Sequence, residues 1–596
     1  MWLKCMLWGL ILSSMGMSLA HDRPPNIVVM LADDAGWGDF SIHGNRTVRT
    51  PNIDALGQAG AVFERFYVCP LCAPTRAEFL TGRYHPRGGV TGVSLGRERL
   101  DLQETTLADS LRQAGYATGI FGKWHNGSQG GYHPLARGFQ FFTGYTEGHW
   151  AEYFDPWLEH QGDVLRKSGY IVEICTDEAL RFMERHVSQP FFCYLPFTTP
   201  HTPWSVPEDD WRRWRDRPIL QSATMNELED LDETRCALAM IEHQDRQVGR
   251  VLQKLRDLGL EEQTIVVYFS DNGPNTWRWN GNLRGRKGST DEGGTRSICV
   301  LRWPGKIPAG RRVSTIAAAI DLLPTLLSLA GVTHVGQRPV DGQDLSPLLM
   351  GADVSWPERL LFSHNNGLVS VRGERFCLDA QGRLYDLVQD PGQTRPVNAE
   401  YPQIMAQLRS AVQIWRREVL GNERHPLPQP RQDLDPRPFP VGGQLFANTW
   451  LPARDARAVG NIQRSSPAPN SSYFVNWSDI DDHIVWQVEV KEAGTYRVTL
   501  YYTCSVADAG AELELCWHDR TLRGKVQQAY DPGVSWFQDT LPRPLAESPA
   551  KRFRALDLGT IDLTAGQGEL RLRAVHIPGR EVMHLRGMML TRMTGI

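Results

Sequence analysis

The stretch "PPNIVVMLADDAGWGD", residues 24–39, decides the fold. Residues 27–31 are an unbroken apolar run, Ile-Val-Val-Met-Leu, without the polar alternation of a half-exposed strand. Such a run is typical of a strand buried on both faces, as in parallel sheets covered by helices. The run ends in Asp33 and Asp34, followed by a glycine turn. The stretch therefore predicts an inner strand of an α/β sheet with two carboxylates at its carboxyl end.

The same pattern recurs further along the chain. Residues 106–125, 177–201 and 239–275 each contain a helix pattern, an apolar strand and then polar residues, and residues 50–68 follow the first strand as a predicted helix. Ligands bind beyond the carboxyl ends of the strands in open parallel sheets, so these polar side chains should meet at one rim. The residues expected there are Asp33, Asp34, Lys123, His125, His201, Asp271 and Asn272.

Composition and pattern divide the chain into five segments. The fold class we expect is α/β, with a large mixed, mostly parallel sheet flanked by helices, a small α+β antiparallel-sheet subdomain and a C-terminal all-β sandwich. Residues 426–442 are dense in proline, which predicts an extended linker. The expected segments are a signal peptide (1–20), the α/β domain (21–335), the small subdomain (336–425), the linker (426–442) and the sandwich (443–596).

The first twenty residues resemble a targeting signal. One early lysine precedes an apolar run, and Ser18-Leu19-Ala20 is a small-x-small cleavage site. A membrane anchor is the alternative, but polar and glycine residues break the run and it is short for a span. We therefore expect an exported protein, periplasmic or extracellular, without membrane insertion after cleavage. The formal net charge of -4 argues against a nucleic-acid partner.

Cys72 lies in "CPLCAPTRAEFLTGR", residues 69–83. Of ten cysteines, Cys5 belongs to the predicted signal, which leaves nine, an odd number in an oxidising compartment. A disulfide with Cys69 would be short and strained, and a zinc site would need a second Cys/His pair that the sequence does not show. If a chemical modification converts Cys72 into another group, eight cysteines remain, which is an even number.

The polar residues at the predicted rim belong to two chemical classes. Asp33, Asp34, Asp271 and Asn272 offer only oxygen donors, which favour Ca²⁺ or Mg²⁺ over zinc. An ordinary strand-to-turn junction is the alternative for one acidic pair, but two pairs after two buried strands favour a metal site. Cationic side chains in glycine- or proline-punctuated loops can clamp an oxyanion or move a proton. These are Arg76, Lys123, His125, His201 and Lys287.

Several ordered motifs together resemble the sulfatase family over residues 24–425. They are "NIVVMLADD" (26–34), "CAPTRAEFLTGR" (72–83), "GKWH" (122–125), "SDNG" (270–273) and "RGRKGSTDEGGTR" (284–296). The resemblance implies that a formylglycine-generating enzyme oxidises Cys72 to formylglycine, with Pro74 and Arg76 in the recognised motif. It also implies one divalent cation, usually Ca²⁺, held by Asp33, Asp34, Asp271, Asn272 and the formylglycine oxygen at position 72.

The resemblance further implies roles in sulfate-ester hydrolysis. Arg76 would hold the formylglycine, and Lys123, His125, His201 and Lys287 would surround the sulfate. One hydroxyl of the aldehyde hydrate attacks sulfur, His201 or Lys287 protonates the leaving alcohol, and His125 deprotonates the second hydroxyl. We expect a sulfated carbohydrate or polysaccharide as substrate. The alternatives are a phosphate or phosphonate monoester hydrolase on the same scaffold and a catalytically silent glycan-binding protein.

Substrate identity should reside outside the shared motifs. We expect it in the loop at 141–156 and in the Trp- and Arg-rich stretch 203–235, which could equally be a docking surface for the sandwich. Asn126, where many family members have leucine, is a further candidate for substrate contact. The C-terminal sandwich resembles domains appended to secreted glycan-degrading enzymes, some of which bind carbohydrate while others only pack.

Overall fold

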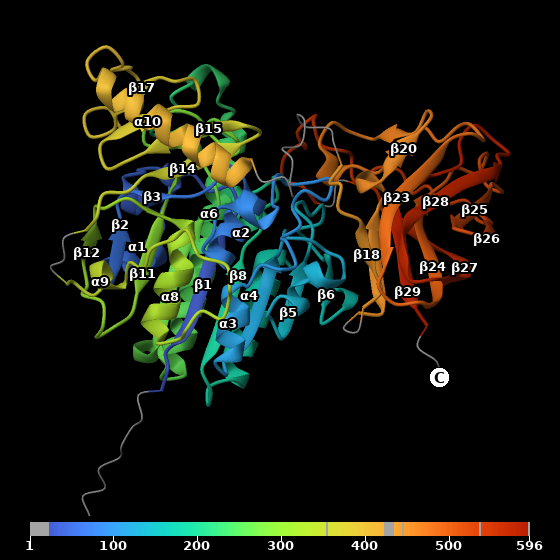
Figure 1. Cartoon of the computed structure of the whole chain (residues 1–596), viewed down its shortest axis with the longest axis horizontal. Helices are drawn as coiled ribbons and strands as arrows, with labels where there is room; N and C mark the ends of the chain where they lie inside the picture. Colours follow the sequence, from blue (N-terminus) through green and yellow to red (C-terminus); the bar gives the residue numbers. More distant parts are fainter. Residues whose placement is uncertain (1–22, 353–355, 422–433, 444–445, 536–537, 594–596) are drawn as a thin grey trace, which may run out of the picture.

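The computed structural model describes residues 23–352, 356–421, 434–443, 446–535 and 538–593. The predicted signal peptide lies outside these residues, as do residues 426–433 of the predicted linker. Figure 1 shows a larger α/β body, coloured blue to yellow, and a β-sandwich in orange and red beside it.

A mixed, mostly parallel sheet forms the centre of the larger body, which confirms the predicted fold class. In the part of the chain described, its ten strands run in the order β12-β2-β11-β9-β1-β8-β4-β5-β6-β7. β1 pairs in parallel with β8 and β9, and β4 pairs in parallel with β8 and β5, whereas β11, β6 and β7 pair antiparallel. The strands are β1 (Asn26–Ala32), β2 (Ala61–Phe63), β4 (Ala117–Lys123), β5 (Phe141–Tyr145), β6 (Trp157–His160), β7 (Asp163–Arg166), β8 (Phe191–Pro196), β9 (Thr264–Ser270), β11 (Cys299–Arg302) and β12 (Arg311–Val313).

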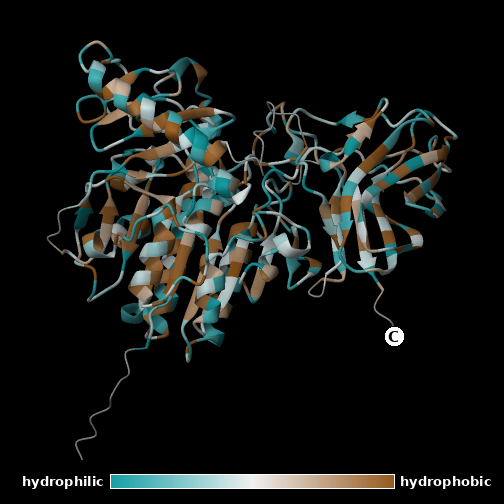
Figure 2. Cartoon of the chain, viewed as in Figure 1, coloured by the Kyte–Doolittle hydropathy of each residue, from teal (hydrophilic) through white to brown (hydrophobic). Residues whose placement is uncertain are grey.

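Two hydrophobic cores explain the unbroken apolar run in β1. Val28 and Met30 pack into one core with α1 (Pro51–Gln58), α4 (Ile171–Arg185) and α6 (Leu231–Asp257). Val29 and Leu31 pack into the other with α2 (Cys72–Thr81), α3 (Leu107–Gln113) and α8 (Leu322–Ala330). Every residue of β1 is buried, and Figure 2 shows the brown, apolar strands enclosed between helices. The predicted burial on both faces is confirmed.

The helix predicted over residues 50–68 is wrong in its second half. The helix α1 ends at Gln58, and the chain then forms β2 and β3 (Phe66–Tyr67). At Gly60 a Cβ atom would stand 2.3 Å from the Leu301 carbonyl oxygen, so only glycine permits this close approach. Tertiary pairing of β2 with β11 overrides the local helix pattern.

Smaller elements complete the larger body. An antiparallel sheet of β14 (Leu361–Asn365), β15 (Leu368–Arg372), β16 (Phe376–Leu378) and β17 (Leu384–Asp386) packs against α10 (Pro402–Trp415). β3 lies between β10 (Arg296–Ser297) and β13 (Ala317–Ala318). The remaining α-helices in the described ranges are α5 (Glu208–Trp214), α7 (Glu292–Thr295) and α9 (Ser346–Leu349).

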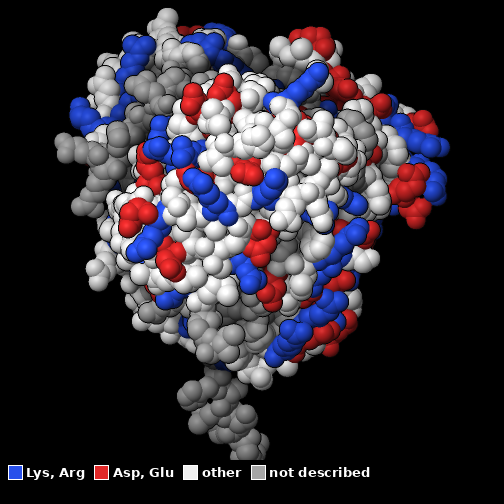
Figure 3. All heavy atoms as spheres, turned by 90° about the vertical axis from the view of Figure 1, so that its right-hand side faces the viewer, with Lys and Arg blue, Asp and Glu red and all other residues white. Residues whose placement is uncertain are grey.

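Two facing sheets form the C-terminal sandwich around one core of apolar side chains. One contains β18 (Phe439–Val441), β20 (Arg457–Val459), β23 (His483–Val490), β25 (Glu512–Trp517), β26 (Arg520–Lys525) and β28 (Gly566–His576). The other contains β19 (Asn448–Pro452), β21 (Gln463–Arg464), β22 (Phe474–Val475), β24 (Gly494–Thr503), β27 (Arg554–Leu563) and β29 (His584–Arg592). Figure 3 shows acidic and basic side chains interspersed on the side of the molecule that carries the sandwich. On the basis of this arrangement, we propose the same domain boundaries that the sequence predicts.

Candidate active site

Four neighbouring parallel strands, β9, β1, β8 and β4, bring the predicted polar residues to one rim. Parallel register places the ends of β1 and β9 side by side, with Ala32 opposite Ser270. The loops after these strands are joined by backbone hydrogen bonds, from Asp33 N–H to the Thr199 carbonyl (3.0 Å) and from Asp271 N–H to the Ala32 carbonyl (3.1 Å). The rim therefore forms as the strand ends predict.

Cys72 is the first residue of α2, a helix whose residues are all buried. Pro74 lies in its first turn, where a missing N–H costs no hydrogen bond. Gly82 ends the helix in the left-handed region at φ 66°. The Cys72 sulfur and carboxylate oxygens of Asp33 and Asp271 all lie within 4.8 Å of one another. The helix thus aims its positive N-terminal end, with Cys72, at the carboxylate cluster.

Cationic side chains surround these carboxylates. Arg76 donates to Asp271 Oδ2 (2.9 Å) and to the Lys123 carbonyl (2.8 Å), and it is fully buried. The Lys123 Nζ lies 2.6 Å from Asp33 Oδ2, and the Lys287 Nζ lies 2.6 Å from Asp34 Oδ1. Buried charges are tolerated only when paired, and here three carboxylates alternate with three cations.

Two buried oxygen atoms fit a divalent cation. Asp33 Oδ1 and Asn272 Oδ1 accept no hydrogen bond from the described residues. Asn272 Nδ2 donates to Asp34 Oδ1 (2.8 Å), which turns its oxygen away from that carboxylate. Buried acceptors are rarely left without a partner, and carboxylate and amide oxygens are ligands of hard cations. The donor set therefore fits Ca²⁺ or Mg²⁺.

Backbone carbonyls fix the tautomers of both rim histidines. The His125 Nε2 lies 2.8 Å from the Val93 carbonyl, so Nε2 carries a proton and the buried, unpartnered Nδ1 can accept one. The His201 Nδ1 lies 2.7 Å from the Thr202 carbonyl, and its Nε2 lies 3.7 Å from Asp34 Oδ2. Both Asp34 (φ 70°) and His125 (φ 61°) have left-handed backbones, an uncommon conformation that concentrates at functional sites.

Burial and neighbouring charges shift the pKa values of the side chains at the rim. Burial, then the adjacent Lys123, hold the pKa of His125 well below its ordinary value. Burial, then Lys287, lower the pKa of His201. Burial alone would lower the pKa of Lys287, but the Asp34 carboxylate raises it instead. Burial raises the pKa of the Cys72 thiol, so this cysteine is a poor thiolate nucleophile as it stands.

The alternatives for Cys72 as a disulfide or zinc ligand find no support. Cys69 and Cys72 are both unpaired, and every other cysteine in the described ranges is also free. The parity of the cysteine count therefore carries no information about disulfides. Cys69 instead lies in a second buried cluster with Glu78 and His85.

A cavity of about 480 Å³ opens above the rim. Asp34, His201 and Lys287 line its floor, whereas Cys72 is only 3% exposed. Sequence reasoning missed much of its wall, which the chain builds from distant segments. These additional lining residues include His149, Trp204, Trp277, Asn470, Ser471 and Glu547. Four lining residues, His149, Trp204, Leu228 and Glu233, lie in the two stretches, 141–156 and 203–235, expected to carry substrate identity.

The stretch 203–235 serves at its start as a docking surface. The Trp204 carbonyl accepts from Thr540 N–H (2.8 Å), and the Ser205 hydroxyl donates to Asp539 (2.9 Å). Asn126, the other candidate for substrate contact, is fully buried and donates to the Ala73 carbonyl (3.1 Å). It supports the first turn of α2 and does not line the cavity.

Comparison with known proteins assigns the family. The sequence model described as Sulfatase matches residues 25–332. N-acetylgalactosamine-6-sulfatase of Canis lupus familiaris is 33% identical over 383 residues, covering 58% of this chain and 70% of that protein. Arylsulfatase A of Homo sapiens is 34% identical over 408 residues, covering 61% and 75%. The chain belongs to the sulfatase family and is a sulfatase enzyme, which disfavours a catalytically silent protein.

Solved structures agree with this fold. Ps i-CgsB, crystallised with k-i-k-neocarrahexaose, superposes with a TM-score of 0.60 at 26% identity, covering 70% of this chain and 96% of that one. A phosphonate monoester hydrolase of Agrobacterium radiobacter superposes with a TM-score of 0.52 at 22% identity, covering 66% and 96%, which shows a shared fold alone. The sulfatase relatives favour sulfate esters over phosphate or phosphonate esters. In the part of the chain that the structure describes, no helix is long and apolar enough to cross a membrane.

Proposed function

We propose that this enzyme hydrolyses sulfate esters of a carbohydrate, with Cys72 as the precursor of the catalytic group. The single observation that carries the proposal is the convergence of Cys72, Asp33 and Asp271 within 4.8 Å, ringed by Arg76, Lys123 and Lys287. A sulfate ester spreads negative charge over its oxygens, which preorganised cations stabilise as the ester bond breaks.

The carbohydrate part of the proposal rests on the relatives and on the cavity. N-acetylgalactosamine-6-sulfatase is named for a sulfated sugar, and Ps i-CgsB was crystallised with k-i-k-neocarrahexaose. Here Trp204 and Trp277 line the cavity beside polar groups. Aromatic faces with hydrogen-bonding neighbours are suited to sugar rings.

If residue 72 is formylglycine, its hydrate would supply one hydroxyl that displaces the alcohol from sulfur and a second whose deprotonation would reform the aldehyde as the bond from carbon to the sulfate oxygen breaks. We assign His125 to take that proton, because its Nδ1 has no hydrogen-bond partner among the described residues and the contact of Nε2 with the Val93 carbonyl leaves Nδ1 unprotonated. His201 lines the cavity with its Nε2 3.7 Å from Asp34 Oδ2. We assign it as the acid that protonates the leaving alcohol, a role in which the Asp34 carboxylate favours the imidazolium against the burial that lowers the pKa of His201. Lys287, held charged by Asp34, is better suited to bind sulfate oxygens than to give up a proton.

The metal-binding part of the proposal assigns Ca²⁺ to Asp33, Asp34, Asp271 and Asn272, with the oxygen at position 72. When bound, the cation neutralises charge that develops on the sulfate oxygens. We also propose that residues 1–20 direct export, that a formylglycine-generating enzyme acts on Cys72 during maturation, and that the mature enzyme is periplasmic or extracellular.

The test combines mass spectrometry with sulfate release. After co-expression with a formylglycine-generating enzyme, the peptide containing Cys72 should carry an aldehyde, and the protein should release sulfate from 4-nitrophenyl sulfate. Cys72→Ala should lose this activity and keep the circular-dichroism spectrum and unfolding temperature of the wild type. Full activity in a preparation whose residue 72 is entirely thiol contradicts the mechanism. Cys193→Ala, a buried cysteine away from the rim, is the matched control.

A further inference from the structure

The C-terminal sandwich is docked against the active-site body through buried polar contacts. Arg454 pairs with Glu147 at 3.0 Å, and their side chains are 10% and 9% exposed. Trp450 Nε1 donates to the same Glu147 (3.0 Å), and Arg543 donates to the Ala151 carbonyl (2.6 Å). Such desolvated pairs hold a fixed geometry, because separating them would leave buried charges without partners.

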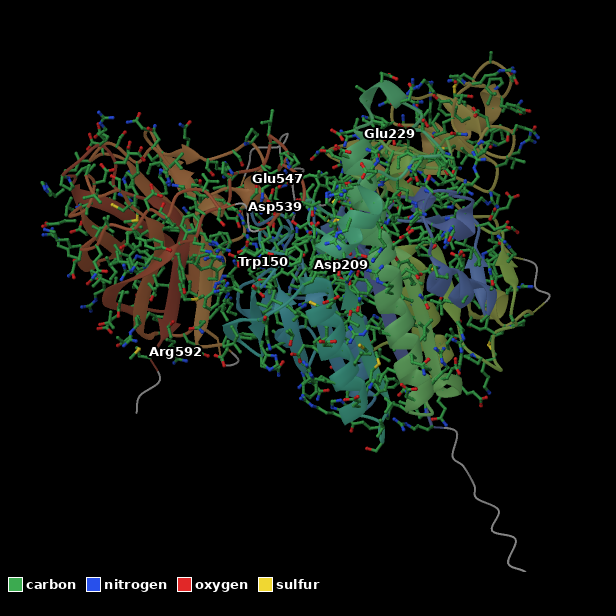
Figure 4. All side chains as sticks on the ribbon, turned by 180° about the vertical axis from the view of Figure 1, so that it is seen from behind. Trp150, Asp209, Glu229, Asp539, Glu547 and Arg592 are labelled. Carbon is green, nitrogen blue, oxygen red and sulfur yellow. The ribbon has the colours of Figure 1, made fainter. Side chains whose placement is uncertain are left out.

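Two sandwich segments reach the cavity itself. The short helix at Pro469–Ser471 brings Asn470 and Ser471 to its wall, and residues 544–547 bring Glu547. Asn470 Nδ2 donates to the Val93 carbonyl (2.7 Å), the same carbonyl that orients His125. Figure 4 shows Asp539 and Glu547 at the junction between the two bodies.

Glu547 and His149 present unsatisfied polar atoms there. Glu547 Oε1 accepts from the Thr202 hydroxyl (2.5 Å), next to His201, while Oε2 accepts no hydrogen bond from the described residues. His149 Nε2, 3.8 Å from that Oε2, is likewise unpartnered, and the His149 side chain is 5% exposed. Orphaned polar atoms in a cavity wall are completed by a ligand or by water.

Cationic and acidic groups therefore share the cavity wall. Lys287 and His201 come from the larger body, whereas Glu547 comes from the sandwich and accepts from Thr202, the residue that follows His201. A carboxylate accepts well from sugar hydroxyl groups, whereas it repels a second sulfate or a uronic-acid carboxylate.

We propose that the sandwich completes the substrate cleft, and that Glu547 with His149 forms a subsite for free hydroxyl groups of the sugar that carries the scissile sulfate. This deepens, and rests on, the proposed function. The sandwich is then part of the catalytic unit and selects sugars whose positions near Glu547 are unsulfated.

The experiment compares two substrates on aldehyde-containing, full-length enzyme. One is 4-nitrophenyl sulfate, which offers no hydroxyl groups to the subsite. The other is whichever of N-acetylgalactosamine 6-sulfate and k-i-k-neocarrahexaose the wild type desulfates faster. Glu547→Ala should lower kcat/KM at least 10-fold on the saccharide and less than 2-fold on the aryl sulfate. Glu547→Gln should restore part of the saccharide activity. Glu569→Ala, an exposed glutamate elsewhere on the sandwich, should leave both unchanged.

Each other outcome has a distinct meaning. Equal losses on both substrates would show that Glu547 positions His201 through Thr202 and would overturn the subsite. Unchanged saccharide kinetics in Glu547→Ala would overturn it too, as would a wild type that cleaves the aryl sulfate and neither saccharide. A wild type inactive on all three substrates contradicts the proposed function itself. In that case, calorimetry measures the binding of the same saccharides to Cys72→Ala and tests the subsite independently of catalysis. Adding Glu547→Ala to this variant must weaken the binding at least 10-fold.

Discussion

At the scale of single residues, the rim was predictable because each ligand-type side chain follows directly after a strand end. Asp33 and Asp271 could be placed together from the apolar runs before them, without knowing any contact. The tautomers of His125 and His201 could not be predicted, because the carbonyl groups that fix them belong to backbone turns.

Arg76 should be among the most important residues for stability. It is fully buried and pairs with Asp271, so Arg76→Ala leaves an uncompensated buried carboxylate and should cost about 3–5 kcal/mol. The free energy of the first unfolding transition in urea, followed by tryptophan fluorescence, measures this. Arg87→Ala breaks the more exposed pair with Asp341 and should cost about 1 kcal/mol or less. Equal costs would contradict the assigned role.

Substitution of Asn272 should test cation binding without an activity assay. Saturating Ca²⁺ should raise the unfolding temperature of the wild type, because a ligand that binds only the folded state stabilises it, by about 2.7 kcal/mol at 100 times Kd. EDTA should reverse this rise. Asn272→Ala should show a smaller rise, whereas Asn448→Ala, an exposed residue on the sandwich, should behave like the wild type. An identical Ca²⁺ response in Asn272→Ala argues against the oxygen ligand set.

At the scale of elements, pairing with a distant strand determined the secondary structure of a segment whose local sequence pattern predicted a helix. Residues 61–67 continue a helix-like sequence after α1, yet Gly60 and the partner strand β11 make them strands. By contrast, both ends of α2 carry local signals, Pro74 in the first turn and Gly82 directly after the last residue. What the sequence did not show is that all of α2 is buried, together with charged side chains.

Glu78, inside α2, should make stability depend on pH. Burial is the largest cause that raises the pKa of Glu78 from its ordinary value of 4.5 to about 8. Between these values the folded state holds a proton that the unfolded state has lost, so stability falls as pH rises through this window. Its contribution is fully present below pH 4.5 and lost above about pH 8.

Glu78→Gln should flatten that slope by up to about 1.4 kcal/mol per pH unit. Urea unfolding of wild type and variant at several pH values between 5 and 8 measures the difference. Glu104→Gln provides the buried control, because the Glu104 carboxylate is paired with Arg83 at 3.1 Å. Parallel pH profiles for wild type and Glu78→Gln would show that Glu78 is already charged in the folded protein.

At the scale of the whole molecule, the limit of sequence reasoning is the contact between distant segments. Glu547 reaches Thr202 across 345 positions, and no local pattern encodes such a pairing. Strand alternation predicted the sandwich itself, but only part of its docking partner on the larger body, Trp204 and Ser205, lies in the stretch at 203–235, whereas Glu147 and Ala151 lie in the loop at 141–156.

Arg454→Met should loosen this docking. It removes the partner of the buried Glu147 and should increase hydrogen exchange at the interface strand β19 and around Trp204, with the sandwich core unchanged. Arg457→Met breaks an exposed pair with Glu569 and should leave exchange at the interface as in the wild type. Unaltered exchange in Arg454→Met would mean that the remaining contacts suffice to hold the two bodies.

The cavity wall drawn from residues 470–547 also has an evolutionary consequence. The proposed catalytic residues all precede residue 300, whereas part of the cavity wall belongs to the sandwich, which has its own hydrophobic core. Recombination that replaces this unit could retarget the enzyme to a different glycan in one step, without any compensating change around Cys72.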